Sequence, residues 1–99
     1  MKIVILRSAR KTIADGYWFY ENQESGLGSY FRNSIMSDIR SLKLYAGVHA
    51  VYFGKYHRLV SRTFPYSIFY RVEDADARVY AVLNNRRDPG LIQEHLNFP

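Results

Sequence analysis

The feature that most constrains the fold is a series of short apolar runs within residues 51–88. Four segments are rich in β-branched and aromatic residues: 51–53, 56–64, 67–72 and 78–83. Runs of this kind, separated by short breaks, are typical of β-strands. Pro65 separates two of these segments and is expected in a turn, because it has no N–H to donate to a central ladder. Residues 73–76 are polar and are expected to form a hairpin connection. We therefore predict a curled, mainly antiparallel sheet whose concave face and C-terminal edge carry the function.

The residues before this sheet have the spacing of a strand followed by an α-hairpin. The apolar run 2–6 predicts an edge strand, and Ser8 is the expected N-cap of a first helix over 9–23. Gly26 and Gly28 interrupt the helical pattern, and a second helix is predicted over 27–45. Its buried stripe is formed by side chains at spacings of four, four and three, namely Phe31, Ile35, Ile39 and Leu42.

Two positions in the first helix predict how closely the two helices pack and which aromatic side chains are exposed on them. Gly16 costs about 1 kcal/mol in a helix relative to alanine, so we expect it to let the second helix approach closely. Tyr17 and Trp18 are adjacent and cannot share one stripe. One of them should therefore be partly exposed, which makes it a candidate for partner binding.

The chain is expected to end in a short helix and to form a single domain over residues 1–99. Asp88 is the predicted N-cap and Pro89 the first residue of a helix over 89–98. Ile92 and Leu96 are four residues apart and would dock this helix on the sheet. A chain of 99 residues supports one hydrophobic core.

The charge balance favours an acidic partner such as nucleic acid or an acidic protein segment. Fourteen bases and nine acids give a net charge of +5, and no acid lies between Asp38 and Glu73. Without cysteine, disulfides and thiolate metal sites are excluded, and a reducing compartment is permitted. The scattered His49, His57 and His95 predict no metal site, and we expect no cofactor. The N-terminal apolar run is too short for a signal peptide or membrane span, so we expect a cytoplasmic protein without a membrane partner.

The order of these elements resembles a known family. The run from Phe64 to Glu73, followed by 79–83 and then Arg86-Arg87-Asp88-Pro89, is similar to the RelE/ParE superfamily of toxins from bacterial type II toxin–antitoxin systems. Upstream, 20–23 followed by Gly26-Leu27-Gly28 is similar to the family's helix-hairpin segment. The resemblance covers nearly the whole chain, and its specificity comes from the order and spacing of four pieces in 99 residues.

The resemblance implies an α+β fold in which an N-terminal strand and α-hairpin pack on the sheet. It also implies a cognate antitoxin whose C-terminal segment wraps over the toxin's hydrophobic and basic surface, and hence a toxin–antitoxin hetero-oligomer. ParE-type members poison DNA gyrase, whereas RelE-type members cut mRNA in the ribosome.

The sequence favours the ParE branch. RNA cleavage needs a base, an acid and cations that stabilise the developing phosphorane charge. Ser67 stands where RelE-like sequences commonly carry an arginine, the terminal helix has no tyrosine, and arginine is a poor general base. The leading hypothesis is therefore gyrase inhibition without enzymatic activity. The alternatives are a ribosome-dependent mRNA endoribonuclease and an inactive member that only binds its antitoxin.

The candidate site residues follow from these hypotheses. A nuclease would use the cations and histidines Arg58, Arg62, Arg87, His57 and His95. Contacts with the target or the antitoxin would use two tyrosines and five arginines: Tyr66, Tyr70, Arg58, Arg62, Arg71, Arg86 and Arg87. Arginine suits this role because it forms bidentate hydrogen bonds to carboxylate or phosphate, while the ordinary alternative is a solvated surface cation.

Overall fold

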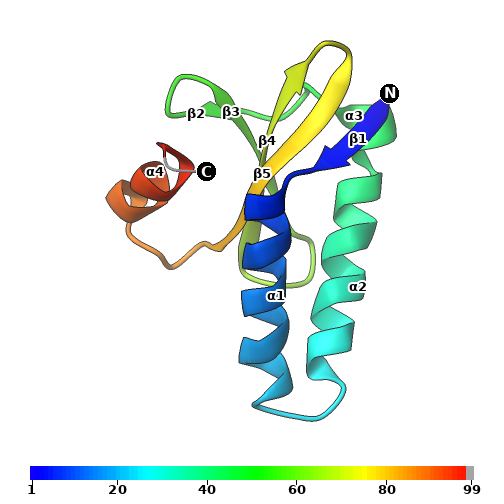
Figure 1. The fold of residues 1–99 in the computed structure, drawn as a ribbon, viewed down its shortest axis with the longest axis vertical. Coiled ribbons are helices and arrows are strands. Elements are labelled where there is room, and N and C mark those ends of the chain that lie inside the picture. The colour runs from blue at the N-terminus through cyan, green and yellow to red at the C-terminus, as the bar shows by residue number, and fades with distance from the viewer. Residues whose placement is uncertain (98–99) are drawn as a thin grey trace.

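The computed structural model describes residues 1–97 and has the α+β fold that the sequence predicts. A five-stranded sheet has the order β1-β5-β4-β3-β2 and is antiparallel except for the parallel pair of β1 and β5. Figure 1 shows the sheet between a pair of long helices and a short terminal helix. The elements in chain order are β1 (Lys2–Ile5), α1 (Arg7–Glu21), α2 (Leu27–Arg40), α3 (Leu42–Tyr45), β2 (Val51–Tyr52), β3 (Tyr56–Val60), β4 (Tyr66–Glu73), β5 (Asp76–Asn84) and α4 (Pro89–Asn97).

Helices α1 and α2 cover one face of the sheet, the hairpin face, and enclose the main core with it. The predicted stripe of α2 is buried there, and β4 contributes Ile68 and Tyr70. Gly16 allows the close contact of the two helices, because a Cβ at this position would lie 2.5 Å from the ring of Phe31. Its predicted role is confirmed.

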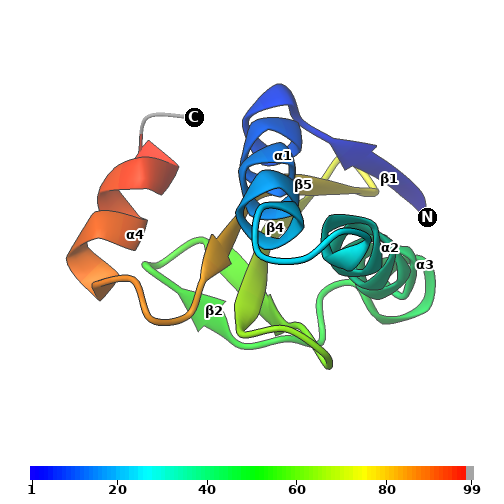
Figure 2. The same cartoon turned by 90° about the horizontal axis from the view of Figure 1, so that it is seen from below.

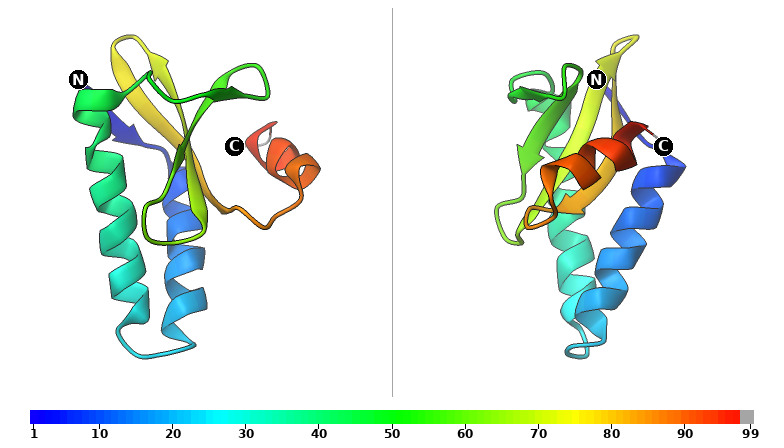
Figure 3. Two further views of the ribbon diagram at one scale, coloured as in Figure 1. Left: turned by 180° about the vertical axis from the view of Figure 1, so that it is seen from behind. Right: turned by 90° about the vertical axis from the view of Figure 1, so that its left-hand side faces the viewer.

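Helix α4 lies on the other face, the α4 face, so the sheet is covered on both sides (Figure 2). Ile92 and Leu96 pack against β-sheet side chains that include Phe69, as their spacing predicted. The Tyr56 hydroxyl donates a hydrogen bond of 3.1 Å to the Leu96 carbonyl, which ties the end of α4 to β3. Figure 3 shows this terminal helix on the side of the sheet opposite the long helices.

Of the two helix caps predicted from the sequence, one is confirmed and the other is wrong. Asp88 caps α4 as predicted, since its Oδ1 accepts the Gly90 N–H at 2.8 Å. The predicted Ser8 cap is wrong: Leu6 precedes the first helical residue and no side chain caps the helix. Ser8 lies inside α1, where its hydroxyl donates to the Tyr80 carbonyl at 2.7 Å and fastens the helix to β5.

The predicted second helix is two helices, because the chain turns at Ser41. The Ser41 N–H donates to both the Ser37 and Asp38 carbonyls, and its hydroxyl donates to the Asp38 carbonyl at 2.6 Å. A serine side chain that binds the preceding backbone competes with the regular helical ladder. The segment 42–45 therefore continues as the short α3.

Strand boundaries shift for similar local reasons. The predicted strand 56–64 ends at Val60, because the Ser61 hydroxyl accepts the N–H groups of Thr63 and Phe64 and bends the chain into a turn. The hairpin connection is tighter than predicted. Asp74 and Ala75 form a two-residue loop with positive φ values of 52° and 64°, as a type I′ turn requires. The predicted helix end at Phe98 lies outside the described residues.

Candidate functional site

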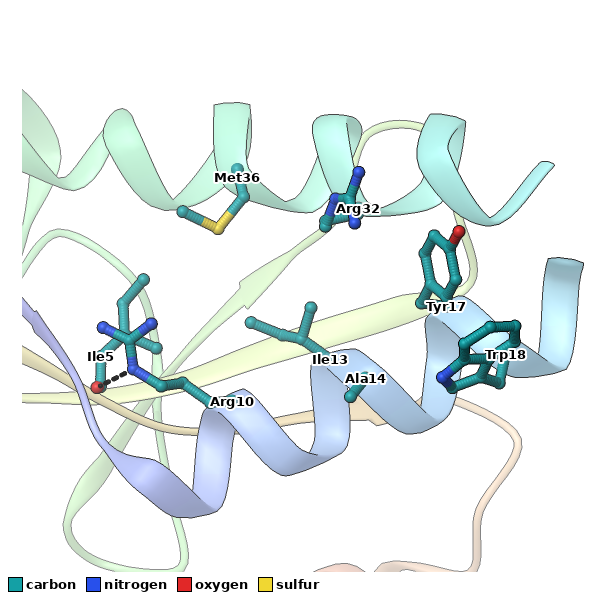
Figure 4. Close-up of a pocket in the computed structure, with 8 residues that line it drawn as sticks. All are labelled: Ile5, Arg10, Ile13, Ala14, Tyr17, Trp18, Arg32 and Met36. Carbon is teal, nitrogen blue, oxygen red and sulfur yellow. Dashed lines mark hydrogen bonds between the residues drawn. The ribbon is translucent and has the colours of Figure 1, made fainter. Parts of the chain in front are cut away.

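One concave surface of the described residues is a groove between α1 and α2, here the α-hairpin groove. It encloses about 550 Å³. Most of its lining is apolar, and Figure 4 shows two arginines among the side chains that face it. The lining residues are Ile5, Arg10, Ile13, Ala14, Tyr17, Trp18, Arg32 and Met36.

Trp18 gives the groove an exposed aromatic wall. Its side chain is 58% exposed, whereas the adjacent Tyr17 is half-buried. The two rings meet edge-on, with centroids 4.9 Å apart. The prediction that one of this pair would be exposed is confirmed. A large exposed aromatic beside other apolar side chains is typical of an interaction surface.

Two arginine side chains border the groove. The Arg10 Nε donates to the Ile5 carbonyl at 3.2 Å, which holds the side chain at the β1 end of the groove (Figure 4). Arg32 lies over the Tyr17 ring, with Cζ 5.0 Å from the ring centroid. Within residues 1–97 neither forms an ion pair. The groove therefore suits a segment with both apolar and acidic side chains.

Sequence reasoning found Trp18 but missed Arg10 and Arg32. The i, i+4 spacing of Arg10 and Ala14, and that of Arg32 and Met36, places each pair on one helix face. That these two faces meet across a groove depends on the packing of α1 on α2.

The predicted site residues fall into three groups, and the first lies on the hairpin face. Arg62 is directed to α2, where its Nε lies 3.3 Å from Asp38 Oδ1. The arginine side chain is 78% exposed and the aspartate side chain only 5%. Tyr66 and Tyr70 are buried in the main core.

Tyr70 also organises the chain between α3 and β2. Its hydroxyl accepts the Gly47 N–H at 2.9 Å and forms a short hydrogen bond with His49 Nδ1. His57 stacks on the Tyr70 ring, with centroids 5.0 Å apart, and its Nδ1 donates to the His49 carbonyl at 2.7 Å. Burial, and then the neighbouring His57, lower the pKa of His49. These contacts indicate that His49 and His57 stabilise the packing of the segment between α3 and β2 on Tyr70.

The second group, Arg58 and Arg71, lies on the α4 face. Arg58 is the cross-strand partner of Phe69, whose ring packs on that side. Arg71 lies over the rings of Tyr56 and Tyr80, at 6.0 Å from each centroid, and its Nε is 3.6 Å from Glu73 Oε1.

The third group follows β5, where Arg87 and His95 come together. Both line a cleft of about 530 Å³ with Leu91 and Glu94. Burial first, and then the charge of Arg87, lower the pKa of His95, so its ring is neutral at pH 7.

Arg87 also borders a smaller hollow of about 280 Å³ at the end of β5, which Tyr66 and Asn84 line as well. Burial raises the pKa of Tyr66, while the Asn84 hydrogen bond and the Arg87 charge oppose that rise. Arg86 is exposed in the turn after β5, and its charge lowers the pKa of the Tyr20 hydroxyl against the larger, raising effect of burial.

The arginines are thus divided between two faces and one end of the sheet, instead of sharing one concave face. His57 and Arg58 are adjacent on β3 and so point to opposite faces. Among residues 1–97, no three potential ligands are close enough to hold a metal ion. None of the helices described is long and apolar enough to cross a membrane.

Comparisons with known proteins show a fold but no sequence family. No protein-family model matches the chain, and no curated protein matches it significantly in sequence. Solved structures do match. One is a chain of the structure titled "Chromosomal ParDE TA system from P. aeruginosa", which superposes with a TM-score of 0.78 at 16% sequence identity. The match covers 85% of this chain and 95% of that one. The chain therefore has a ParE-like fold.

Proposed function

We propose that this chain is the toxin of a type II toxin–antitoxin pair, that an antitoxin segment occupies the α-hairpin groove, and that the free toxin inhibits DNA gyrase. The observation that carries the proposal is the combination of a ParE-like fold with an apolar groove bordered by two cations. A net charge of +5 fits partners that are acidic overall.

The groove defines what the antitoxin must supply. Trp18 offers apolar surface, and Arg10 and Arg32 offer charge without carboxylate partners in residues 1–97. A helix or extended segment with alternating apolar and acidic side chains complements all three. Tryptophan and arginine are the usual hot spots of such interfaces, and each truncation of a hot spot costs about 2 kcal/mol or more, which corresponds to roughly 30-fold in affinity.

The division of the arginines favours gyrase over mRNA as the target. A ribonuclease needs a base, an acid and phosphate-binding cations around one bond. His57 is stacked on Tyr70 on the hairpin face, whereas Arg58 lies on the α4 face. Arg62 is held by Asp38. Inhibition by binding requires no such convergence.

One observation favours the ribonuclease as a second candidate. Arg87 and the neutral His95 share a cleft, and Tyr66 lies in the adjoining hollow that Arg87 also borders. These three side chains could supply a cation, a base and a proton donor.

The experiment is expression of the chain in bacteria, alone and together with the protein encoded beside its gene. We expect growth arrest with filamentation and a DNA-damage response for the chain alone, and normal growth for the pair. Loss of polysomal mRNA with intact DNA would establish the second candidate. Normal growth in both cultures would leave only an inactive member that binds its antitoxin.

Trp18→Ala tests the groove within this experiment. The variant should still arrest growth but should lose rescue by the antitoxin, with affinity reduced roughly 30-fold. Leu44→Ala is the matched control, because Leu44 is 82% exposed on α3 and does not line the groove. Equal rescue of the wild type and both variants would exclude the groove as the antitoxin site.

A further inference from the structure

Four aromatic rings from separate segments form one partly exposed surface, here the aromatic end surface. Its members come from α1, from α2 and from the turn between β3 and β4, and they are Phe19, Tyr20, Tyr30 and Phe64. The Phe64 ring contacts Tyr20 and Tyr30, at centroid distances of 4.8 and 5.3 Å. The centroids of Phe19 and Tyr20 are 5.1 Å apart. The four side chains are therefore contiguous, and Figure 3 shows that turn beside the long helices.

The surface is open to solvent on one side and anchored in the main core on the other. Phe19 and Tyr30 are each 55% exposed, whereas Tyr20 and Phe64 are half-buried. The centroids of both half-buried rings lie 5.2 Å from that of the fully buried Phe31. Side chains held in this way lose little conformational freedom when a partner binds, which favours affinity. A contiguous exposed aromatic surface is typical of an interaction site.

The aromatic end surface is separate from the α-hairpin groove. None of its four side chains lines the groove. Trp18 does so, but the next residue, Phe19, points about 100° away around the helix. Phe19 lines the smaller hollow at the end of β5 instead. A partner on the aromatic end surface therefore uses side chains that the groove does not present.

An exposed arginine adds positive charge to this surface. Arg86 lies in the turn after β5, and its charge lowers the pKa of the Tyr20 hydroxyl, although burial has the larger and opposite effect. Within residues 1–97 Arg86 forms no ion pair. Aromatic residues and arginine are enriched where proteins bind each other. An arginine without an ion pair suits a carboxylate on the partner.

The ring orientations favour a protein over nucleic acid as that partner. Phe64 meets Tyr20 and Tyr30 at interplanar angles of 56° and 62°. Phe19 meets Tyr20 at 81°. Successive bases stack on ring faces, and rings inclined so steeply to one another offer no common platform. Apolar side chains, by contrast, pack against the edges and the faces of aromatic rings alike.

We propose that the aromatic end surface is where the toxin binds the protein that it inhibits, with apolar side chains of the target on the rings and a carboxylate on Arg86. The inference rests on the proposed function and deepens it, because it gives the target and the antitoxin different surfaces of the α-hairpin. Trp18 and Phe19 are adjacent, so an antitoxin segment in the groove lies beside the target surface and hinders a large target sterically. Neutralisation then requires no shared contact.

The first test is growth arrest of bacteria that express the full chain, which does not depend on which protein is the target. Phe19→Ala/Tyr30→Ala should abolish the arrest at an expression level at which the wild type stops growth. Tyr45→Ala is the matched control and should arrest growth as the wild type does. Tyr45 is 56% exposed on α3, at the other end of α2 (Figure 1).

The second test is the affinity of the purified chain for gyrase, measured by biolayer interferometry. Phe19→Ala and Tyr30→Ala should each weaken binding about tenfold or more, as truncation of an interface hot spot does. Arg86→Glu should weaken it about tenfold, because the reversed charge repels the carboxylate of the target. Each variant should keep the wild-type affinity for the protein encoded beside the gene, which shows that the α-hairpin groove is intact.

Growth arrest by the double variant equal to that by Tyr45→Ala would overturn the inference. So would variants that bind gyrase normally but lose the protein encoded beside the gene, since the surface would then belong to the antitoxin. Binding of labelled oligouridylate that the double variant alone loses, at unchanged affinity for gyrase, would assign the surface to nucleic acid instead.

The same measurements separate the surface from the identity of the target. Loss of arrest in the double variant, with no binding of the wild type to gyrase, would support the surface and refute gyrase as the target. A wild type that does not arrest growth would refute the proposed function and the inference with it. Thermal unfolding checks that each variant is folded. Arg86→Glu changes an exposed side chain, so if the truncated variants do not fold, full arrest and unchanged gyrase affinity in this variant would overturn the inference.

Discussion

The packing of α1 on α2 at Gly16 gives the sharpest prediction, because two physical effects of known sign oppose each other there. Gly16→Ala should stabilise the helix by about 1 kcal/mol through backbone propensity. The new methyl carbon, however, would lie 2.5 and 2.6 Å from two atoms of the Phe31 ring. Phe31 is fully buried against aromatic neighbours and cannot turn away. Overpacking of this kind costs about 1–3 kcal/mol, so the net change should lie between neutral and about 2 kcal/mol destabilising.

Two further variants isolate the steric part of that prediction. Ala14→Gly measures helix propensity alone, since Ala14 is exposed on the same helix. Phe31→Leu makes room for the methyl group, so the double variant Gly16→Ala/Phe31→Leu should be more stable than the sum of the single effects by about 1–3 kcal/mol. The assay is urea unfolding followed by circular dichroism. A Gly16→Ala variant that is about 1 kcal/mol more stable than wild type, with no coupling to Phe31, would refute the close approach of the helices.

Two other predictions concern histidine and the buried carboxylate. Burial lowers the folded-state pKa values of His49 and His95 below the unfolded value. The unfolded chain therefore binds protons more readily, and the free energy of unfolding should fall as the pH drops below about 6.5. His49→Gln should flatten part of this slope in unfolding titrations between neutral and acidic pH, and an unchanged slope would contradict it. Arg62→Gln should destabilise by about 1–3 kcal/mol, because it leaves the buried Asp38 carboxylate without a charged partner. Asp38→Asn should cost less in the same urea assay, and the reverse order would contradict the role of Arg62 as the charged partner of Asp38.

Helical spacing made the core of the hairpin predictable from sequence. Phe31, Ile35 and Ile39 recur at intervals of four, and the three are buried together. Asp88 followed by Pro89 likewise predicted a helix start, because a cap depends on residues that are close in the chain. Such local signals also identified the sheet segments, although side-chain hydrogen bonds of Ser41 and Ser61 ended two elements early.

The candidate site was less predictable, because its geometry depends on residues distant in sequence. Arg62 meets Asp38 across 24 positions, and Arg58 meets Asn85 across 27. No spacing rule reveals either pair. The period of two along a strand predicts that neighbours such as His57 and Arg58 point apart, but which face each one joins is decided by packing.

Gyrase inhibition by this chain is best tested by measuring DNA cleavage by gyrase in the presence of the purified chain. Supercoiled plasmid is incubated with gyrase, ATP and the chain, and the products are trapped by denaturation and separated by electrophoresis. We expect linear plasmid that accumulates with increasing chain concentration and disappears when the antitoxin is added first. Plasmid that remains supercoiled at every concentration, while cellular mRNA is cut instead, would contradict it.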